Sequence, residues 1–230
     1  LLGEEYIPLG DSEFGPVLNK IREAQPDFIF STVVGASDIA FHRQFKQAGF
    51  DAEKMPIASL TTGEIETKAM GAEYGAGHFL SAPYFMALDN PTNEKFVDGF
   101  LASPYGKNGV THYNMSETYN SAYVFKAAME KAIAEHGFDE VTPARVRDAC
   151  AGVKLSADIS PEGETWVDED NFNTWLVPKI GICQSDGSFK IVKQADAHVA
   201  PDPYSIYPDI GTCKANGLVA PDGTVRTDVI

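Results

Sequence analysis

The chain has 230 residues, of which 43% are hydrophobic and 22% are charged, enough for one large domain or two small ones with a buried core. This composition excludes a disordered or collagen-like chain, and no apolar run approaches the roughly 18 residues of a transmembrane helix. With 18 basic and 33 acidic residues the formal net charge is −15. A chain this acidic repels phosphate backbones and anionic lipids, so neither nucleic-acid binding nor direct membrane insertion is expected.

The N-terminal segment, Leu1 to Pro8, has no initiator methionine, no basic region and no small-residue cleavage site. We therefore expect the sequence to be a mature or truncated piece of a longer translation product.

The first third of the chain alternates between strand and helix patterns. Residues 5–9 have the pattern of a short strand, and Asp11 and Ser12 offer N-cap oxygens to a following helix. The apolar stripe of that helix is Phe14, Val17, Leu18 and Ile21. Residues 28–34 are almost continuously apolar or β-branched, which predicts a strand that is covered on both faces.

The same alternation continues to residue 82. A second helix is expected to run to Gly49, and residues 56–60 and 77–81 are expected to form strands. Between these strands, Thr61 and Glu64 have the spacing of a capping box at the start of a third helix. Strands separated by single helices predict βαβ units and a parallel sheet with flanking helices, which is an α/β fold.

The character of the sequence changes after Pro83. Helix starts are predicted at Asn90 and at Thr142-Pro143, with a long helix over about 116–135 between them. Short strands are expected at 164–167, 178–182 and 188–192, the last two joined by an Asp186-Gly187 hairpin turn. Beyond Ala200 periodicity disappears, so the chain is expected to end in an irregular extension.

The three cysteines, Cys150, Cys183 and Cys213, form no Cys-x-x-Cys pair. A disulfide between Cys183 and Cys213 would close a loop of about 30 residues and stabilise the fold by roughly 3–4 kcal/mol. The alternative is that all three thiols are reduced. A disulfide would favour an exported protein, and reduced thiols a cytoplasmic one.

Signals for an enzyme, a cofactor or a metal are poor. The five histidines fit no metal-ligand or nucleophile motif, and the glycines at 71–77 do not form a dinucleotide-binding fingerprint. Asp168-Glu169-Asp170 begins like a calcium loop, but Phe172 and Asn173 stand where a ligand and a glycine are required. The sequence therefore predicts a protein that is not an enzyme, with no cofactor and no metal.

Ligands of open parallel sheets bind beyond the carboxyl ends of the strands. Val34 and Gly35 follow one predicted strand, and Thr61 and Thr62 follow the next. Their backbone N–H groups and hydroxyls suit a carbonyl oxygen or an anion, with Tyr84 as a pocket wall. The alternatives are that Thr61 only caps its helix, that Gly35 only permits a turn and that Tyr84 packs in the core.

Several of these segments, in this order, resemble the amide-sensing and urea-binding members of the type I periplasmic binding proteins, within the branched-chain amino-acid-binding superfamily. The resemblance rests on Asp27–Gly35, Pro56–Thr62 and Ala82–Phe85 with Asp89–Pro91. It extends over about the first 205 residues through Glu4–Leu9, Pro161–Gly163, Asn171–Trp175 and Pro201–Tyr204.

The resemblance implies a fold of two α/β lobes joined by three crossovers, of which this chain lacks most of the first lobe. On this reading residues 1–114 form the second-lobe ligand-binding domain and 115–152 are helices that return to the first lobe. Residues 153–204 form short strands and a crossover between the lobes, and 205–230 form an irregular tail.

The resemblance also implies a ligand class. Branched-chain amino-acid binders carry an acidic residue about where Thr61 stands and an aromatic residue near Val34. The hydroxyl of Thr61 and the small aliphatic side chain of Val34 in this chain therefore favour a small neutral amide or urea as the ligand. The implied ligand-binding residues are Val34, Gly35, Thr61, Thr62 and Tyr84, and the implied partner is an ABC permease in the periplasm or outside the cell. The alternatives are a cytoplasmic amide sensor that acts on a regulatory partner, or a structural surface protein.

Overall fold

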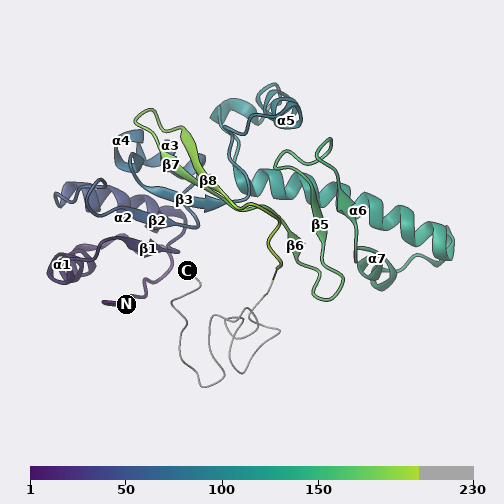
Figure 1. Ribbon diagram of the computed structural model, residues 1–230, viewed down its shortest axis with the longest axis horizontal. Coiled ribbons are helices and arrows are strands. Elements are labelled where there is room, and N and C mark those ends of the chain that lie inside the picture. Colours follow the sequence, from purple (N-terminus) through teal and green to yellow (C-terminus); the bar gives the residue numbers. More distant parts are fainter. Residues whose placement is uncertain (202–230) are drawn as a thin grey trace, which may run out of the picture. The chain divides into compact units, whose positions relative to one another are not determined.

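A computed structural model describes residues 1–201 (Figure 1), except for the side chain of Asn108. The predicted tail and Cys213 lie outside the described residues. The chain divides into two compact units. Unit 1 comprises residues 1–121, 156–164 and 177–197, and unit 2 comprises residues 122–155, 165–176 and the chain from 198.

Unit 1 is built on a five-stranded sheet in the order β1-β2-β3-β7-β8. The first three strands are parallel to one another: β1 (Ile29–Ser31), β2 (Ile57–Ser59) and β3 (Phe79–Ala82). Two antiparallel strands complete the sheet: β7 (Lys179–Cys183) and β8 (Phe189–Gln194). The predicted α/β fold is confirmed, with a sheet that is mixed because β7 and β8 form a hairpin beside β3.

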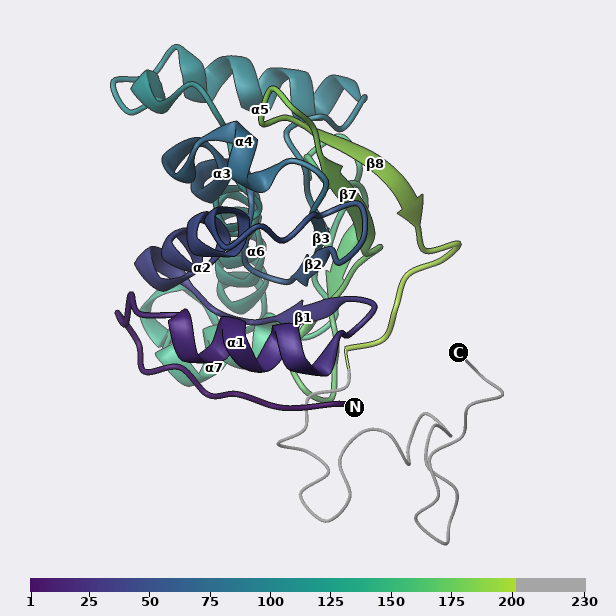
Figure 2. The ribbon, with the colours of Figure 1, turned by 90° about the vertical axis from the view of Figure 1, so that its left-hand side faces the viewer.

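The helix before β1 and the helices between the parallel strands lie together on one side of this sheet (Figure 2). They are α1 (Gly15–Ala24), α2 (Gly35–Gln47), α3 (Glu64–Met70) and the single-turn α4 (Ala72–Gly75). The core beneath them contains buried apolar side chains from α1, α2 and β2, namely Phe14, Leu18, Phe41, Phe45 and Ile57. Each such side chain contributes about 1.5–3 kcal/mol through burial.

The opposite face of the sheet carries a row of apolar side chains. The strand register aligns Phe30 with Ala58, Ala58 with Phe79 and Phe79 with Ile182. Phe28 and Phe30 remain 57% and 63% exposed on this face, whereas Ser31 on the other face is buried. The prediction that residues 28–34 are covered on both faces is therefore wrong for these two phenylalanines.

The N-terminal segment differs from its prediction. Residues 5–9 form no strand, and Tyr6 and Leu9 are each 85% exposed. No described strand pairs with residues 5–9, so this segment lacks the ladder of hydrogen bonds that a strand needs. The predicted N-cap is also wrong, because α1 begins after Phe14, whose N–H donates to the Gln44 side chain at 3.0 Å.

Helices α5 (Pro91–Leu101) and α6 (Tyr113–His136) follow β3, with a short 3-10 turn at Gly106–Asn108 between them. Asn90 caps α5 as predicted by accepting a hydrogen bond from the Asn93 N–H. Helix α6 begins in unit 1 and continues into unit 2.

Unit 2 has its own small core of buried apolar side chains, Ala128, Ala132, Val146 and Ala149. After a 3-10 turn at Phe138–Glu140, helix α7 (Pro143–Ala149) begins at the predicted cap, where Thr142 Oγ1 accepts from the Arg145 N–H. A separate sheet joins β4 (Lys154–Leu155), β5 (Thr165–Val167) and β6 (Thr174–Trp175). The sequence pattern predicted β5 but neither β4 nor β6, which are only two residues long.

Candidate functional site

The predicted site begins where β1 and β2 end. The Thr61 hydroxyl donates to the carbonyl oxygen of Val33 at 2.6 Å, which places the two strand tips side by side. Gly35 opens α2 with φ +63°, a left-handed conformation that suits glycine. Val34 is the N-cap residue of α2 and provides no side-chain cap, so the first turn of the helix presents backbone N–H groups beside an exposed Val34 side chain.

Thr62 points into the protein rather than out from the strand tip. Its side chain is buried, and its hydroxyl lies 3.0 Å from Asp38 Oδ1 and 2.7 Å from Ser59 Oγ. Asp38 is fully buried on α2, where Oδ1 also lies 3.2 Å from His42 Nδ1. In this structure Thr62 therefore ties β2 to α2 and does not face the surface.

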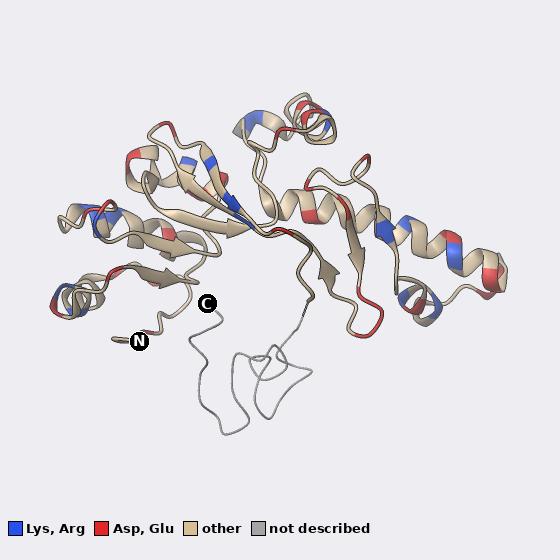
Figure 3. Cartoon of the chain, in the orientation of Figure 1, with Lys and Arg blue, Asp and Glu red and all other residues tan. Residues whose placement is uncertain are grey.

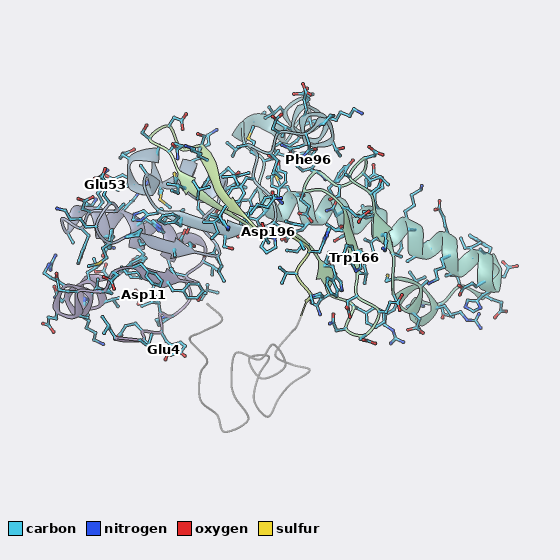
Figure 4. The ribbon with its side chains drawn as sticks, viewed as in Figure 1. Glu4, Asp11, Glu53, Phe96, Trp166 and Asp196 are labelled. Atoms are coloured by element: carbon cyan, nitrogen blue, oxygen red, sulfur yellow. The ribbon has the colours of Figure 1, made fainter. Side chains whose placement is uncertain are left out.

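Tyr84 is also buried. None of its surface is exposed, and its hydroxyl lies 2.6 Å from Thr111 Oγ1. Its ring packs edge-on against Phe96 of α5, a residue labelled in Figure 4. Burial raises the pKa of Tyr84 above its usual value. The structure thus places Tyr84 in the core of unit 1 and not along an open wall.

The helix start after β2 is built differently from the predicted capping box. The Gly63 N–H donates to Glu66 Oε2 at 3.0 Å, and Glu66 also lies 3.1 Å from His112 Nε2. A Cβ at position 63 would lie 2.5 Å from His112 Nε2, so the close approach requires glycine. The prediction that Thr61 caps with Glu64 is wrong, because the Thr61 hydroxyl is bonded to Val33.

Glu64 and Tyr113, near this helix start, make contacts that the capping-box prediction did not include. Glu64 is buried, and its Oε1 accepts from the Met86 N–H at 2.7 Å, which ties α3 to the segment after β3. Burial raises the pKa of Glu64, although the Met86 hydrogen bond opposes this. The Tyr113 hydroxyl donates to the carbonyl oxygen of Thr61 at 3.4 Å, and burial raises its pKa to about 12.

The accessible surface of the two tips is uncharged. Residues 32–36 and 60–63 contain no ionisable side chain, and the carboxyl groups of Asp38 and Glu64 are buried behind them. The Thr61 hydroxyl donates its proton to Val33 and lies 3.2 Å from Ser59 Oγ, which can donate to it, so one lone pair is left to accept a hydrogen bond from a ligand. The tips can therefore offer one acceptor from Thr61 and backbone N–H donors from α2 to a small polar molecule.

Other features of the described residues do not involve the residues of these tips. A pocket of about 320 Å³ contains His78, whose pKa burial lowers to about 3, and a second of about 310 Å³ is lined by Trp166 and Trp175. No cluster of metal-ligating side chains and no helix capable of spanning a membrane occurs in the part of the chain that the structure describes.

The predicted disulfide involves a cysteine outside the described residues, Cys213. Its predicted partner Cys183 carries a free thiol that is buried on β7, and burial raises the pKa of this thiol to about 11. Cys150 is also a free thiol at the end of α7.

One family model and several known proteins match this chain. The family described as Periplasmic binding protein domain matches residues 1–209. The chain is 25% identical to the leucine-, isoleucine-, valine-, threonine- and alanine-binding protein of Pseudomonas aeruginosa, over 72% of this chain and 40% of that protein. It is 27% identical to a protein named limonene hydroxylase from Geobacillus stearothermophilus, over 58% of this chain and 23% of that protein.

A similar solved structure is the solute-binding protein of an ABC transporter from Rhodopseudomonas palustris HaA2 in complex with p-hydroxybenzoic acid. The TM-score is 0.69 and the identity 21%, with 84% of this chain and 51% of that chain covered. This likeness shows the fold. The chain spans about half of that structure and less than half of the two curated relatives.

Proposed function

Because this chain belongs to the periplasmic binding protein domain family, we propose that it contributes one lobe and part of a second to a solute-binding protein that closes around a small solute. Solute that contacts both lobes would shift the population toward the closed form. An ABC permease in the membrane would then recognise that closed form, which places the protein in the periplasm or outside the cell.

The proposed ligand class rests on the uncharged surface at the tips of β1 and β2. An amino acid in this position would bring an ammonium group that needs an accessible carboxylate, whereas a carboxylate ligand would find the N–H groups of α2 but no side-chain cation. Residues 32–36 and 60–63 contain neither an acidic nor a basic side chain. A short aliphatic amide or urea matches the groups that are present, because its NH₂ can donate to Thr61 and its carbonyl can accept from N–H groups of α2.

This assignment differs from the ligands named for the relatives. The Pseudomonas aeruginosa protein is named for branched-chain and small amino acids, and the Rhodopseudomonas palustris structure contains p-hydroxybenzoic acid. Leucine and p-hydroxybenzoate are therefore the informative competitors for acetamide and urea.

Isothermal titration calorimetry on the intact polypeptide that contains this chain tests the proposal. We expect saturable binding of acetamide or urea and no heat of binding from leucine or p-hydroxybenzoate. Binding of leucine without acetamide or urea would reverse the ligand class while leaving the solute-binding function in place. No binding by any of the four compounds would count against both.

A further inference from the structure

A lysine is buried in unit 1 without a carboxylate as its hydrogen-bond partner. Lys179 is 3% exposed at the start of β7, one of two neighbouring strands that carry lysines (blue in Figure 3). Its Nζ lies 2.7 Å from the carbonyl oxygen of Pro83, 3.0 Å from that of Val177 and 3.4 Å from that of Glu162. An ammonium has three N–H donors, so all three are directed at backbone carbonyls of separate segments.

The Glu162 side chain lies in the same region and faces helix α6. Its Oε1 accepts from Asn120 Nδ2 at 3.2 Å, and its Oε2 accepts from the Ser116 hydroxyl at 3.4 Å. The Asn120 amide also donates to Ser160 Oγ at 3.0 Å. Buried Lys179, half-buried Glu162 and these buried partners form a polar cluster that we call the crossing cluster.

The crossing cluster lies where the chain passes out of unit 1. Helix α6 passes from unit 1 to unit 2 after Ser121, next to Asn120. Residues 156–164, which contain Ser160 and Glu162, are joined to unit 2 at both ends, and the chain re-enters unit 1 at Val177. The hydrogen bonds of this one cluster therefore fix the ends of several segments. These segments must keep their relative positions if a lobe is to move as a rigid body.

We propose that Lys179 and Glu162 are positioning residues for solute binding, and that the protonation of Glu162 makes the anchoring of these segments depend on pH. The effect on solute affinity rests on the proposed function. The effect on the anchoring itself does not, because it concerns contacts within unit 1.

The charges around Glu162 determine whether the anchoring becomes stronger or weaker as the pH rises. Desolvation and the Glu117 carboxylate of α6 raise its pKa to about 7, while the Lys179 ammonium of β7 and the hydrogen bonds from Ser116 and Asn120 oppose the rise. Tyr84, from the segment after β3, is the other titratable group that interacts with Glu162. The ordered cluster therefore favours a protonated, neutral Glu162.

Opening of the cluster returns Glu162 to water and to its ordinary pKa of 4.5. The folded arrangement binds more protons than the opened one between these two values, so its stability falls as the pH rises from 4.5 to about 7. Above that range both states are ionised and the dependence levels off. An ionised Glu162 would also draw Lys179 Nζ away from the Pro83 carbonyl.

Hydrogen–deuterium exchange between pH 5 and 8 tests the anchoring. After correction for intrinsic rates, we expect the protection of amides in residues 83–86, 160–164 and 177–181 to fall by up to roughly tenfold per pH unit below pH 7 and then to level off. Glu162→Gln should keep the protection high and remove its pH dependence, except at the Met86 amide, which donates to the buried Glu64 carboxyl. Glu94→Gln, an exposed site on α5, is the matched control and should behave as the wild type. Identical pH profiles for the wild type and Glu162→Gln would overturn the proposal.

Two further measurements separate the anchoring from solute binding. Lys179→Met should lower protection in the same three ranges at every pH, whereas the control Lys95→Met on α5 should not.

Acetamide does not titrate between pH 5 and 8, so a change of its Kd with pH in the wild type that disappears in Glu162→Gln would support the coupling. A pH-dependent Kd that is unchanged in Glu162→Gln would refute it. Absence of acetamide binding would remove the ligand class but leave the exchange test valid.

Discussion

At the scale of single residues, two neighbouring threonines at the end of β2 have different partners. Thr61 is half-buried, donates to a backbone carbonyl of the neighbouring strand tip and lies 3.2 Å from Ser59 Oγ, which leaves one lone pair for a ligand. Thr62 is buried and bonded to Asp38, a carboxylate whose Oδ2 has no hydrogen-bond partner. The first hydroxyl is therefore suited to a ligand, and the second maintains the position of the strand tip.

Paired substitutions should separate these two roles. Thr62→Val removes a hydrogen bond to a buried carboxylate, so we expect it to lower the free energy of unfolding by about 1–3 kcal/mol. Thr61→Val should change stability less and weaken acetamide binding instead. Urea denaturation and calorimetry measure the two effects. Equal losses of stability in both variants, with unchanged acetamide affinity for Thr61→Val, would contradict this assignment of roles.

The sequence predicted the helix starts at Asn90 and Thr142 correctly, whereas its predicted caps at Asp11 or Ser12 and at Thr61 are wrong. A helix start requires only a polar side chain a few residues from the N–H that it accepts from, a pattern that lies within one segment. The burial of Thr62 and Tyr84 depends on Asp38 and Thr111, which lie 24 and 27 residues away in the sequence. No pattern within one segment could identify those partners.

At the scale of elements, β1 is one of the two edge strands of its sheet and has one covered and one exposed face. The apolar run from Phe28 predicted a strand, and the strand is present, but three residues long. Composition alone could not indicate which face is covered. That depends on the side of the sheet to which the connecting helices cross, and α1, α2 and α3 all lie on the same side (Figure 2).

Two phenylalanines of unit 1 should therefore differ sharply in their contribution to stability. Phe45 is 1% exposed beneath α2, so Phe45→Ala should lower the free energy of unfolding by about 3–5 kcal/mol through the cavity that it leaves. Phe30→Ala should change it by less than about 1 kcal/mol, because Phe30 is largely in solvent. Chemical denaturation of the two variants gives the comparison. A large loss for Phe30→Ala would mean that the exposed face is covered in solution.

At the scale of the whole molecule, the chain passes repeatedly between two units that each contain their own core. The sequence indicated the α/β pattern of unit 1 because its strands and helices alternate along the chain. It did not indicate the crossing cluster, since Lys179 and Pro83 lie 96 residues apart and their contact involves a backbone carbonyl that any residue could supply. Helix α6 belongs to both units, and its continuous pattern shows no boundary between them.

Separate cores predict separate responses to substitution. Val146 packs with Ala128, Ala132 and Ala149 in unit 2, so Val146→Ala should lower hydrogen-exchange protection in α7 by an amount that corresponds to about 1–3 kcal/mol. Leu80 packs with Phe85 and Phe189 in unit 1, so Leu80→Ala should lower protection in β3 and β7 instead. Exchange measured by mass spectrometry on both variants distinguishes the units. Loss of protection in β3 on Val146→Ala, equal to the loss in α7, would mean that the two cores unfold as one cooperative body, because a local defect reaches distant amides only through global unfolding.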